Sequence, residues 1–168
     1  MVGAGHVEAG DRAGGIDGRR LALLYAAFAA LALAVYAPSL RGEFLSDDLG
    51  YVVANPWVRG LALGSPWSLL DPFGEAAAYV ANWAPVHLFA HALEWRIFGA
   101  DTLGWRVVNV LVHAGVAALL VPVFLRAGVS AVPAALAALL FLLHPASVEV
   151  VAWITQLKTL LCLAFGVG

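Results

Sequence analysis

An uncharged apolar run near the amino terminus constrains this chain more than any other feature. Residues 21–40 contain no Asp, Glu, Lys or Arg. A helix of about 20 residues rises about 1.5 Å per residue, so it crosses the roughly 30 Å of hydrocarbon in a bilayer. Arginines precede the run, as in a signal peptide, but the run exceeds the usual apolar length of about 7–15 residues in such peptides. We expect a retained membrane-spanning helix.

The composition extends this expectation to the whole chain. Hydrophobic residues make up 62% and charged residues 12%, against about 45–50% and 25% in soluble domains. A net charge of −2 gives no electrostatic reason to expect nucleic-acid binding. The single cysteine, Cys162, excludes a disulfide within the chain. We predict an all-α, polytopic membrane protein in contact with membrane lipids.

Further apolar runs suggest about four spans in one transmembrane domain, residues 19–168. Residues 1–18, rich in Gly and Ala, are expected to form a disordered cytoplasmic tail. Basic residues collect on the cytoplasmic side of inner-membrane proteins. In a bacterial inner membrane, Arg20 and Arg126 therefore place the amino terminus on the cytoplasmic side and the loop 41–100 on the outer side. The predicted spans cover residues 21–40, 102–125, 131–143 and 149–167.

The outer loop ends in a predicted helix, residues 82–98. Asn82 can cap this helix, and Pro85 suits its first turn. Its histidines, Glu94 and Arg96 make it too polar for a lipid-facing span. We expect short juxtamembrane helices here, lying along the interface or packed inside the protein.

Adjacent carboxylates, Asp47 and Asp48, follow the first span by a few residues. One of them could accept a proton from a hydroxyl nucleophile while the other binds a metal or positions the acceptor. A solvated acidic turn or a helix cap is the structural alternative.

His87, His91 and Glu94 recur at i, i+4 and i+7, which places them on one helical face. Histidine and carboxylate at such spacing can hold a divalent cation. We take His91 and Glu94 as candidate ligands for Mg or Mn. The polar side of an interfacial helix is the alternative.

Three polar residues, Arg106, Asn109 and His113, share a face of the second span. Ionisable groups inside a membrane usually face a partner or a cavity. Hydrogen bonding between packed helices is the alternative explanation.

The fourth run carries Glu149, Trp153 and Gln156 on one face of a continuous helix. Lys158 lies in the middle of this apolar run, off that face. A lysine buried there needs an anion, either a carboxylate or a lipid phosphate.

Four stretches, in this order and spacing, resemble bacterial membrane proteins related to the TMTC-type O-mannosyltransferases. They are FLSDDLGYVVANPWVRG (44–60), NWAPVHLFAHALEWRIFG (82–99), WRVVNVLVHAGVAALL (105–120) and FLLHPASVEVVAWITQLKTLL (141–161). The resemblance implies the GT-C fold, of which this chain would hold only the first part. Many bacterial members continue into tetratricopeptide repeats.

The resemblance also implies an activity. A sugar leaves a polyprenyl-phosphate carrier with inversion and joins a hydroxyl of a protein or glycan acceptor, such as Ser or Thr. In that case Asp47 and Asp48 are the catalytic residues. The substrate-binding candidates are Arg106, Asn109, His113, His144, Glu149, Trp153 and Lys158.

Three hypotheses remain open at this point. The chain is the amino-terminal portion of such a glycosyltransferase, inactive in this short form because the cavity is incomplete. Alternatively, it is a non-catalytic membrane scaffold that retains the first half of the fold. A small transporter or channel subunit fits the intramembrane lysine and histidine but does not explain the Asp-Asp loop.

Overall fold

The computed structural model describes residues 16–168, so the predicted tail lies outside the described residues except for its last three positions. The described part is helical and contains no strand, which confirms the all-α prediction. The elements, with η marking single 3₁₀ or π turns, are α1 (Gly18–Tyr36), η1 (Ala37–Ser39), η2 (Leu49–Val53), η3 (Trp57–Leu61), α2 (Ala62–Gly64), η4 (Pro66–Leu70), α3 (Glu75–Tyr79), α4 (Pro85–Phe98), α5 (Thr102–Arg126), α6 (Ala131–Leu143), α7 (Ser147–Ala152), η5 (Ile154–Gln156) and α8 (Leu157–Val167).

Two helical segments are long and apolar enough to cross a membrane, Gly18–Ser39 and Thr102–Arg126. The first begins at Asp17, whose side chain accepts the backbone N–H of Arg20 at 2.8 Å. The third predicted span, α6, is apolar but has only 13 residues. Of the four predicted spans, the described structure therefore supports two.

The fourth predicted span is wrong as a continuous helix. Helix α7 ends at Ala152, and Trp153 adopts an extended conformation with φ −93° and ψ 120°. The chain then makes the short turn η5 before α8 begins at Leu157. The predicted common face of Glu149, Trp153 and Gln156 required a continuous helix, so it does not follow. The same break places Lys158 in the first turn of α8, exposed, rather than buried in the middle of a span.

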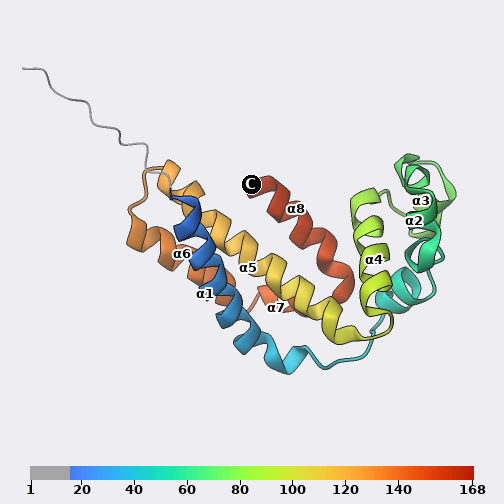
Figure 1. The fold of residues 1–168 in the computed structure, drawn as a ribbon, viewed down its shortest axis with the longest axis horizontal. Coiled ribbons are helices and arrows are strands. Elements are labelled where there is room, and N and C mark those ends of the chain that lie inside the picture. The colour runs from blue at the N-terminus through green and yellow to red at the C-terminus, as the bar shows by residue number, and fades with distance from the viewer. Residues whose placement is uncertain (1–15) are drawn as a thin grey trace, which may run out of the picture.

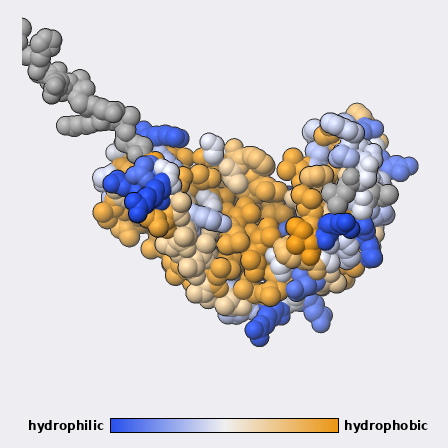
Figure 2. All heavy atoms as spheres, in the orientation of Figure 1, coloured by the Kyte–Doolittle hydropathy of each residue, from blue (hydrophilic) through white to orange (hydrophobic). Residues whose placement is uncertain are grey.

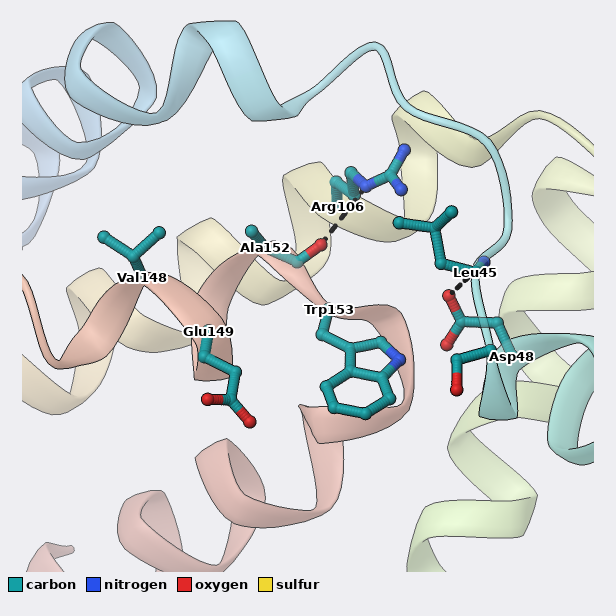
Figure 3. Close-up of a pocket in the computed structure, with 8 residues that line it drawn as sticks. Leu45, Asp48, Arg106, Val148, Glu149, Ala152 and Trp153 are labelled. Atoms are coloured by element: carbon teal, nitrogen blue, oxygen red, sulfur yellow. Dashed lines mark hydrogen bonds between the residues drawn. The ribbon is translucent and has the colours of Figure 1, made fainter.

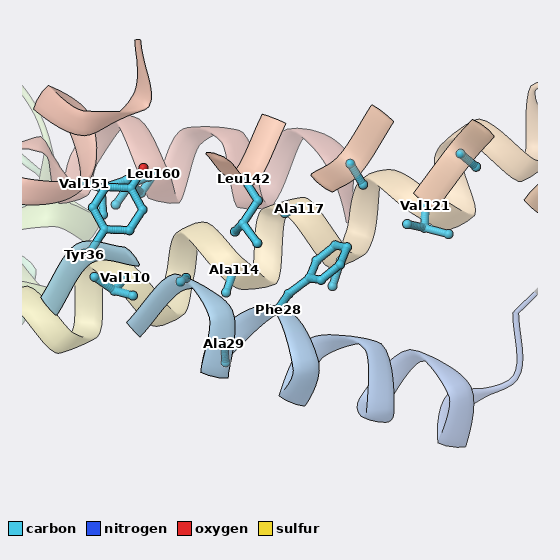
Figure 4. Close-up of a cluster of buried hydrophobic side chains, with 14 residues drawn as sticks. Phe28, Ala29, Tyr36, Val110, Ala114, Ala117, Val121, Leu142, Val151 and Leu160 are labelled. Atoms are coloured by element: carbon cyan, nitrogen blue, oxygen red, sulfur yellow. The ribbon is translucent and has the colours of Figure 1, made fainter. Parts of the chain in front are cut away.

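Helix α5 lies at the centre of the spanning layer, with α1, α6 and α8 packed against it (Figure 1). Small residues let α1 approach closely: Ala29 and Ala32 of α1 and Ala114 and Ala117 of α5 are all buried. Figure 4 shows the Phe28 ring of α1 directed toward α5. Such small-residue contacts are typical of helix pairs in membranes, where van der Waals packing holds the helices together.

The outer loop builds a second, separate core beside the spans. Val52, Val58, Leu88 and Ala92 are buried there against Trp105, which lies at the start of α5. Helices α2, α3 and α4 therefore gather at one end of the molecule (Figure 1). Figure 2 shows apolar side chains across the spanning layer and hydrophilic side chains at its ends.

The close packing of α1 on α5 yields a first prediction. Ala32 is fully buried, whereas Ala30 on the same helix is exposed. Ala32→Leu should push the two helices apart and lower the free energy of unfolding by about 1–3 kcal/mol. Ala30→Leu, the matched control, should leave it nearly unchanged. Titration of both variants with SDS in detergent micelles measures this difference, and equal stabilities would contradict the packing described.

Candidate functional site

A buried arginine ties the start of the outer loop to the break between α7 and α8. The Arg106 guanidinium donates to the carbonyls of Gly42, Glu43 and Ala152, with the last two at 2.6 and 3.2 Å. A Cβ on Gly42 would lie 2.8 Å from this guanidinium, so a larger residue there would make the arginine side chain shift. Three hydrogen bonds of the Arg106 guanidinium therefore go to backbone carbonyls.

Asp48 makes the reciprocal connection with acceptors. Its side chain is 1% exposed. One carboxylate oxygen accepts the N–H of Leu45 and the other accepts the N–H of Thr155, each at 3.1 Å. Asn109 completes the connection by donating to the carbonyl of Trp153 at 2.9 Å. These side chains satisfy backbone groups that the break leaves without helical partners, which stabilises the break.

The two adjacent carboxylates consequently have different environments. Asp48 is buried and bonded to backbone on both oxygens, whereas Asp47 is exposed. The preceding residue, Ser46, has a φ of +49°, a left-handed conformation that non-glycine residues seldom adopt. The sequence presented a pair, and the fold separates the two side chains.

Asp48 lines a cavity of about 350 Å³, here called the Asp48 cavity. Glu149 and Trp153 come from the broken helix to line it, and Figure 3 shows the Trp153 indole between the Glu149 and Asp48 side chains. The indole N–H is buried and has no hydrogen-bond partner among the described residues. The full lining is Leu45, Ser46, Asp48, Arg106, Val148, Glu149, Ala152 and Trp153.

Asp47 lines a different cavity of about 460 Å³, the Asp47 cavity, together with Lys158. Tyr51, in η2, contacts both the outer loop and α8. Its hydroxyl donates to Asn82 at 3.1 Å, and the Lys158 ammonium of α8 is 6.0 Å from the centre of its ring. The sequence did not single out Tyr51, although its position four residues after Asp47 is a usable signal. Asn82, expected as a helix cap, bonds Tyr51 instead, and Ala84 precedes α4.

The three polar residues His87, His91 and Glu94 lie on one face of α4, as their spacing predicted, and the structure shows that this face is buried. The His87 and His91 rings lie 4.2 Å apart between centroids, and His91 Nδ1 lies 2.6 Å from a Glu94 oxygen. The Nε2 atoms of both histidines have no partner among the described residues. No group of three His, Cys, Asp or Glu in residues 16–168 is arranged to hold a metal ion, so the cation expected at His91 and Glu94 stays a prediction.

Burial keeps this cluster neutral. It lowers the pKa of His87 to about 2, with nearby His91 and Lys158 adding to the effect. Burial also lowers the pKa of His91 to about 3 against an opposing contribution from Asp48, and raises the pKa of Glu94 to about 8. At neutral pH the Glu94 carboxyl therefore keeps its proton and can donate it in a hydrogen bond to His91.

The remaining candidates lie elsewhere. His113 bonds the Leu142 carbonyl at 3.1 Å, and exposed His144 accepts the N–H of Ala146 at 3.2 Å. These two histidines line a third cavity of about 270 Å³, whose lining contains neither aspartate. Together with Arg106 and Asn109, His113 makes the hydrogen bonds between packed elements that we considered as the alternative for this helical face.

Comparison with known proteins shows which proteins this chain is similar to. The chain is 33% identical to the mouse "Protein O-mannosyl-transferase TMTC1" over 95% of its length. It is 28% identical to human "Protein O-mannosyl-transferase TMTC4" over 80% of its length, and 32% identical to Drosophila melanogaster "Protein O-mannosyl-transferase Tmtc1" over 73%. The chain is homologous to TMTC-type transferases.

The chain covers only 18%, 20% and 15% of these three relatives, so it corresponds to less than a quarter of each. No family model and no solved structure matches it. The names of the relatives support a glycosyltransferase-like function.

The buried cluster predicts how stability depends on pH. Between pH 6.5 and 8, the unfolded chain has released the Glu94 proton while the folded chain still holds it, so stability falls as pH rises. The loss should reach about 2 kcal/mol at about 1.4 kcal/mol per pH unit. Glu94→Gln should abolish this decline, since the amide can still donate to His91.

In Glu94→Gln, the decrease of stability toward acid pH should persist. Below pH 6.5 the unfolded histidines bind protons that folded His87 and His91 do not, so stability falls as pH falls. Unfolding midpoints at pH 5, 6.5 and 8 test both limbs, with the exposed Glu75→Gln as control. Parallel curves for Glu94→Gln and the unmodified chain would contradict the buried neutral carboxyl.

Proposed function

We propose that this chain is part of a membrane glycosyltransferase that moves a sugar from a polyprenyl phosphate to a hydroxyl of a protein or glycan. The relatives are named protein O-mannosyl-transferases, which supports mannose and a Ser or Thr acceptor. One observation carries the proposal: Asp47 and Lys158 line the same cavity although they are 111 positions apart in the sequence. Such a transfer needs a base for the nucleophile and a cation for the leaving phosphate.

Asp47 would act as the base. It is exposed, and it lies in the outer loop, where it lines the Asp47 cavity. Its carboxylate takes the proton of the acceptor hydroxyl, and the hydroxyl oxygen then bonds to the anomeric carbon of the sugar. The bond from that carbon to the phosphate oxygen breaks at the same time, and the electron pair leaves with the phosphate. Attack opposite the leaving group inverts the anomeric configuration.

Lys158 would receive the negative charge that develops on the phosphate. Its ammonium is exposed within the cavity, and the Tyr51 ring lies beneath it. Arg106 is less suited to this role, since its guanidinium already bonds three backbone carbonyls. We assign Arg106 and Asn109 to positioning, and Glu149 and Trp153 to the lining of the adjacent Asp48 cavity.

Asp48 would act as a positioning residue. Its two bonded oxygens fix the turn that carries Asp47 and the segment that precedes Lys158. We further propose an inner-membrane location with the amino terminus in the cytoplasm, as the basic residues suggest.

Substitution of the two aspartates separates the proposed base from the positioning residue. In the full-length protein, Asp47→Asn should lower mannosyl transfer from polyprenyl-phosphate mannose by about 10²–10⁴-fold while leaving the unfolding midpoint unchanged. Asp48→Asn should lower both, because an amide N–H would face one of the two backbone N–H groups. Glu75→Gln, in the same loop, is the control. Undiminished transfer by Asp47→Asn would contradict the assignment of Asp47 as the base.

Lys158 should govern donor binding. Lys158→Met removes the charge and keeps an unbranched chain, so the KM for polyprenyl-phosphate mannose should rise. Lys158→Arg should retain much of the affinity. Tyr51→Phe keeps the ring beneath the ammonium, whereas Tyr51→Leu removes it, so only the latter should raise the KM appreciably. Unchanged donor KM in Lys158→Met would remove this residue from the site.

A further inference from the structure

Two arginines of the outer loop line a cavity that the proposed sugar transfer does not use. This cavity, the arginine cavity, has a volume of about 560 Å³, and both Arg59 and Arg96 line it. Its walls come from η3, α2 and α4, which pack against one another, and Figure 1 shows α2 and α4 side by side. It shares no lining residue with the Asp47 cavity or the Asp48 cavity. It is therefore a separate candidate site.

The charge of the arginine cavity is opposite to that of the loop around it. Residues 41–100 contain six acidic residues but only three basic ones, Arg41, Arg59 and Arg96. Two of these three arginines line the cavity, and no carboxylate does. Neither of the two forms an ion pair with a carboxylate of residues 16–168. Two guanidinium groups around one cavity, without a counter-charge from the described residues, attract an anion.

The Arg59 guanidinium is held in place beside the cavity. Its Nη1 donates to the Val53 carbonyl at 3.2 Å, and its central carbon lies 4.8 Å from the centre of the Trp95 ring. A guanidinium carries five N–H donors in a planar fork, so the bond to Val53 leaves most of them for a ligand. Because these contacts already order the side chain, less conformational entropy is lost when a ligand binds.

Arg96 and two glycines complete the cavity. Arg96 lies in the last turn of α4, and its side chain is exposed. A Cβ added to Gly60 or Gly64, which also line the cavity, would meet no atom within 4 Å. The space beside the two guanidinium groups is therefore open to a ligand.

We propose that the arginine cavity binds a phosphoryl group, carried by a lipid headgroup or by a soluble phosphate. Guanidinium groups match phosphate oxygens through pairs of parallel N–H···O bonds, which are stronger than bonds between neutral groups. A phosphoryl group presents oxygens to both arginines at once. The bound group would join Arg59 of η3 to Arg96 of α4 and stabilise the outer-loop core, to which Val58 and Ala92 of the cavity wall belong.

Each arginine also has a structural explanation of its own. Arg59 contacts the face of Trp95, and Arg96 places a positive charge at the carboxyl end of α4, where the helix dipole favours it. Neither role needs the other arginine. A test of the proposal must therefore show that Arg59 and Arg96 act together.

Modification of arginines by phenylglyoxal tests the proposal in the full-length protein in maltoside micelles. Mass spectrometry of peptides gives the modification rate at each arginine separately. Arg41, exposed in the same loop but outside the cavity, is the internal reference. Inorganic phosphate is one probe and phosphatidylglycerol in mixed micelles is the other, and each is compared with chloride at equal ionic strength.

A probe at about ten times its Kd should slow modification of Arg59 and Arg96 about tenfold, because about one site in ten is then free. The rate at Arg41 should not change. Protection by inorganic phosphate would identify a site for soluble phosphate, and protection by phosphatidylglycerol alone would identify a site for a lipid headgroup. Protection by both would show that the phosphoryl group itself is bound.

Two variants test whether the arginines share the ligand. Arg96→Gln should abolish the protection of Arg59, because one guanidinium remains to hold the probe. Gly64→Asp should abolish the protection of both arginines, since it adds a carboxylate that competes with the probe, and the open space at Gly64 accepts a side chain. Unfolding midpoints equal to that of the unmodified protein confirm that both variants fold.

Equal modification rates with either probe and with chloride would overturn the proposal. Protection of Arg59 that persists in Arg96→Gln would overturn it too, because each arginine would then bind or be screened by itself. Lys158→Met, in the Asp47 cavity, should leave the protection intact. The test reads the arginine cavity without sugar transfer, so it can fail while the proposed function stands.

Discussion

The hydrogen bonds across the α7–α8 break are the interaction on which the site depends. A helix broken beside a membrane leaves carbonyl and N–H groups without partners, and each costs free energy if it stays unpaired. Here Arg106 and Asn109 donate to carbonyls of the break, while Asp48 accepts one of its N–H groups. Arg106 and Asp48 also bond the start of the outer loop. The same side chains therefore shape the break and attach the loop to it.

This connection explains the different environments of two neighbouring acids. Asp48 is used to hold backbone, which frees its neighbour Asp47 to face a cavity. Because the chain turns at Trp153, α8 starts beside the loop, and Lys158 reaches that cavity from its first turn. A continuous helix would have carried the lysine along the axis of the span, away from the loop. The proposed base and the proposed phosphate ligand thus share a cavity because the helix breaks.

Much of the fold could be predicted from the sequence. The uncharged run and the long apolar segment after Thr102 are strong signals because of their length and lack of charge, and the structure places helices there with nearly the expected bounds. The shared face of His87, His91 and Glu94 on α4 also followed from their spacing, whereas its burial comes from the structure. The break at Trp153 could not be predicted, since the residues from Glu149 onward are compatible with a helix. Tertiary hydrogen bonds from Arg106, Asn109 and Asp48 override that local preference.

The site was harder to predict for the same reason. Spacing alone treated Asp47 and Asp48 as equivalent, and it placed Lys158 in mid-span, because both conclusions assumed local regularity. Tyr51 had no signal beyond its position in the loop, Asn82 was expected only as a helix cap, and only the fold brings the two together. The relatives support a glycosyltransferase-like function, while the separation of the two acids comes from the geometry.

The distance between positions 47 and 158 tests the central claim most directly. Spin labels at Asp47 and Lys158 in the Cys162→Ser chain, measured by dipolar spectroscopy in vesicles, should give one short and narrow distance distribution. Asp48→Ala should broaden that distribution, since it removes the Thr155 bond that ties the loop to the break and the Leu45 bond that fixes the turn within the loop. A long distance in the chain with Asp48 intact, or a distribution that Asp48→Ala leaves unchanged, would contradict the account.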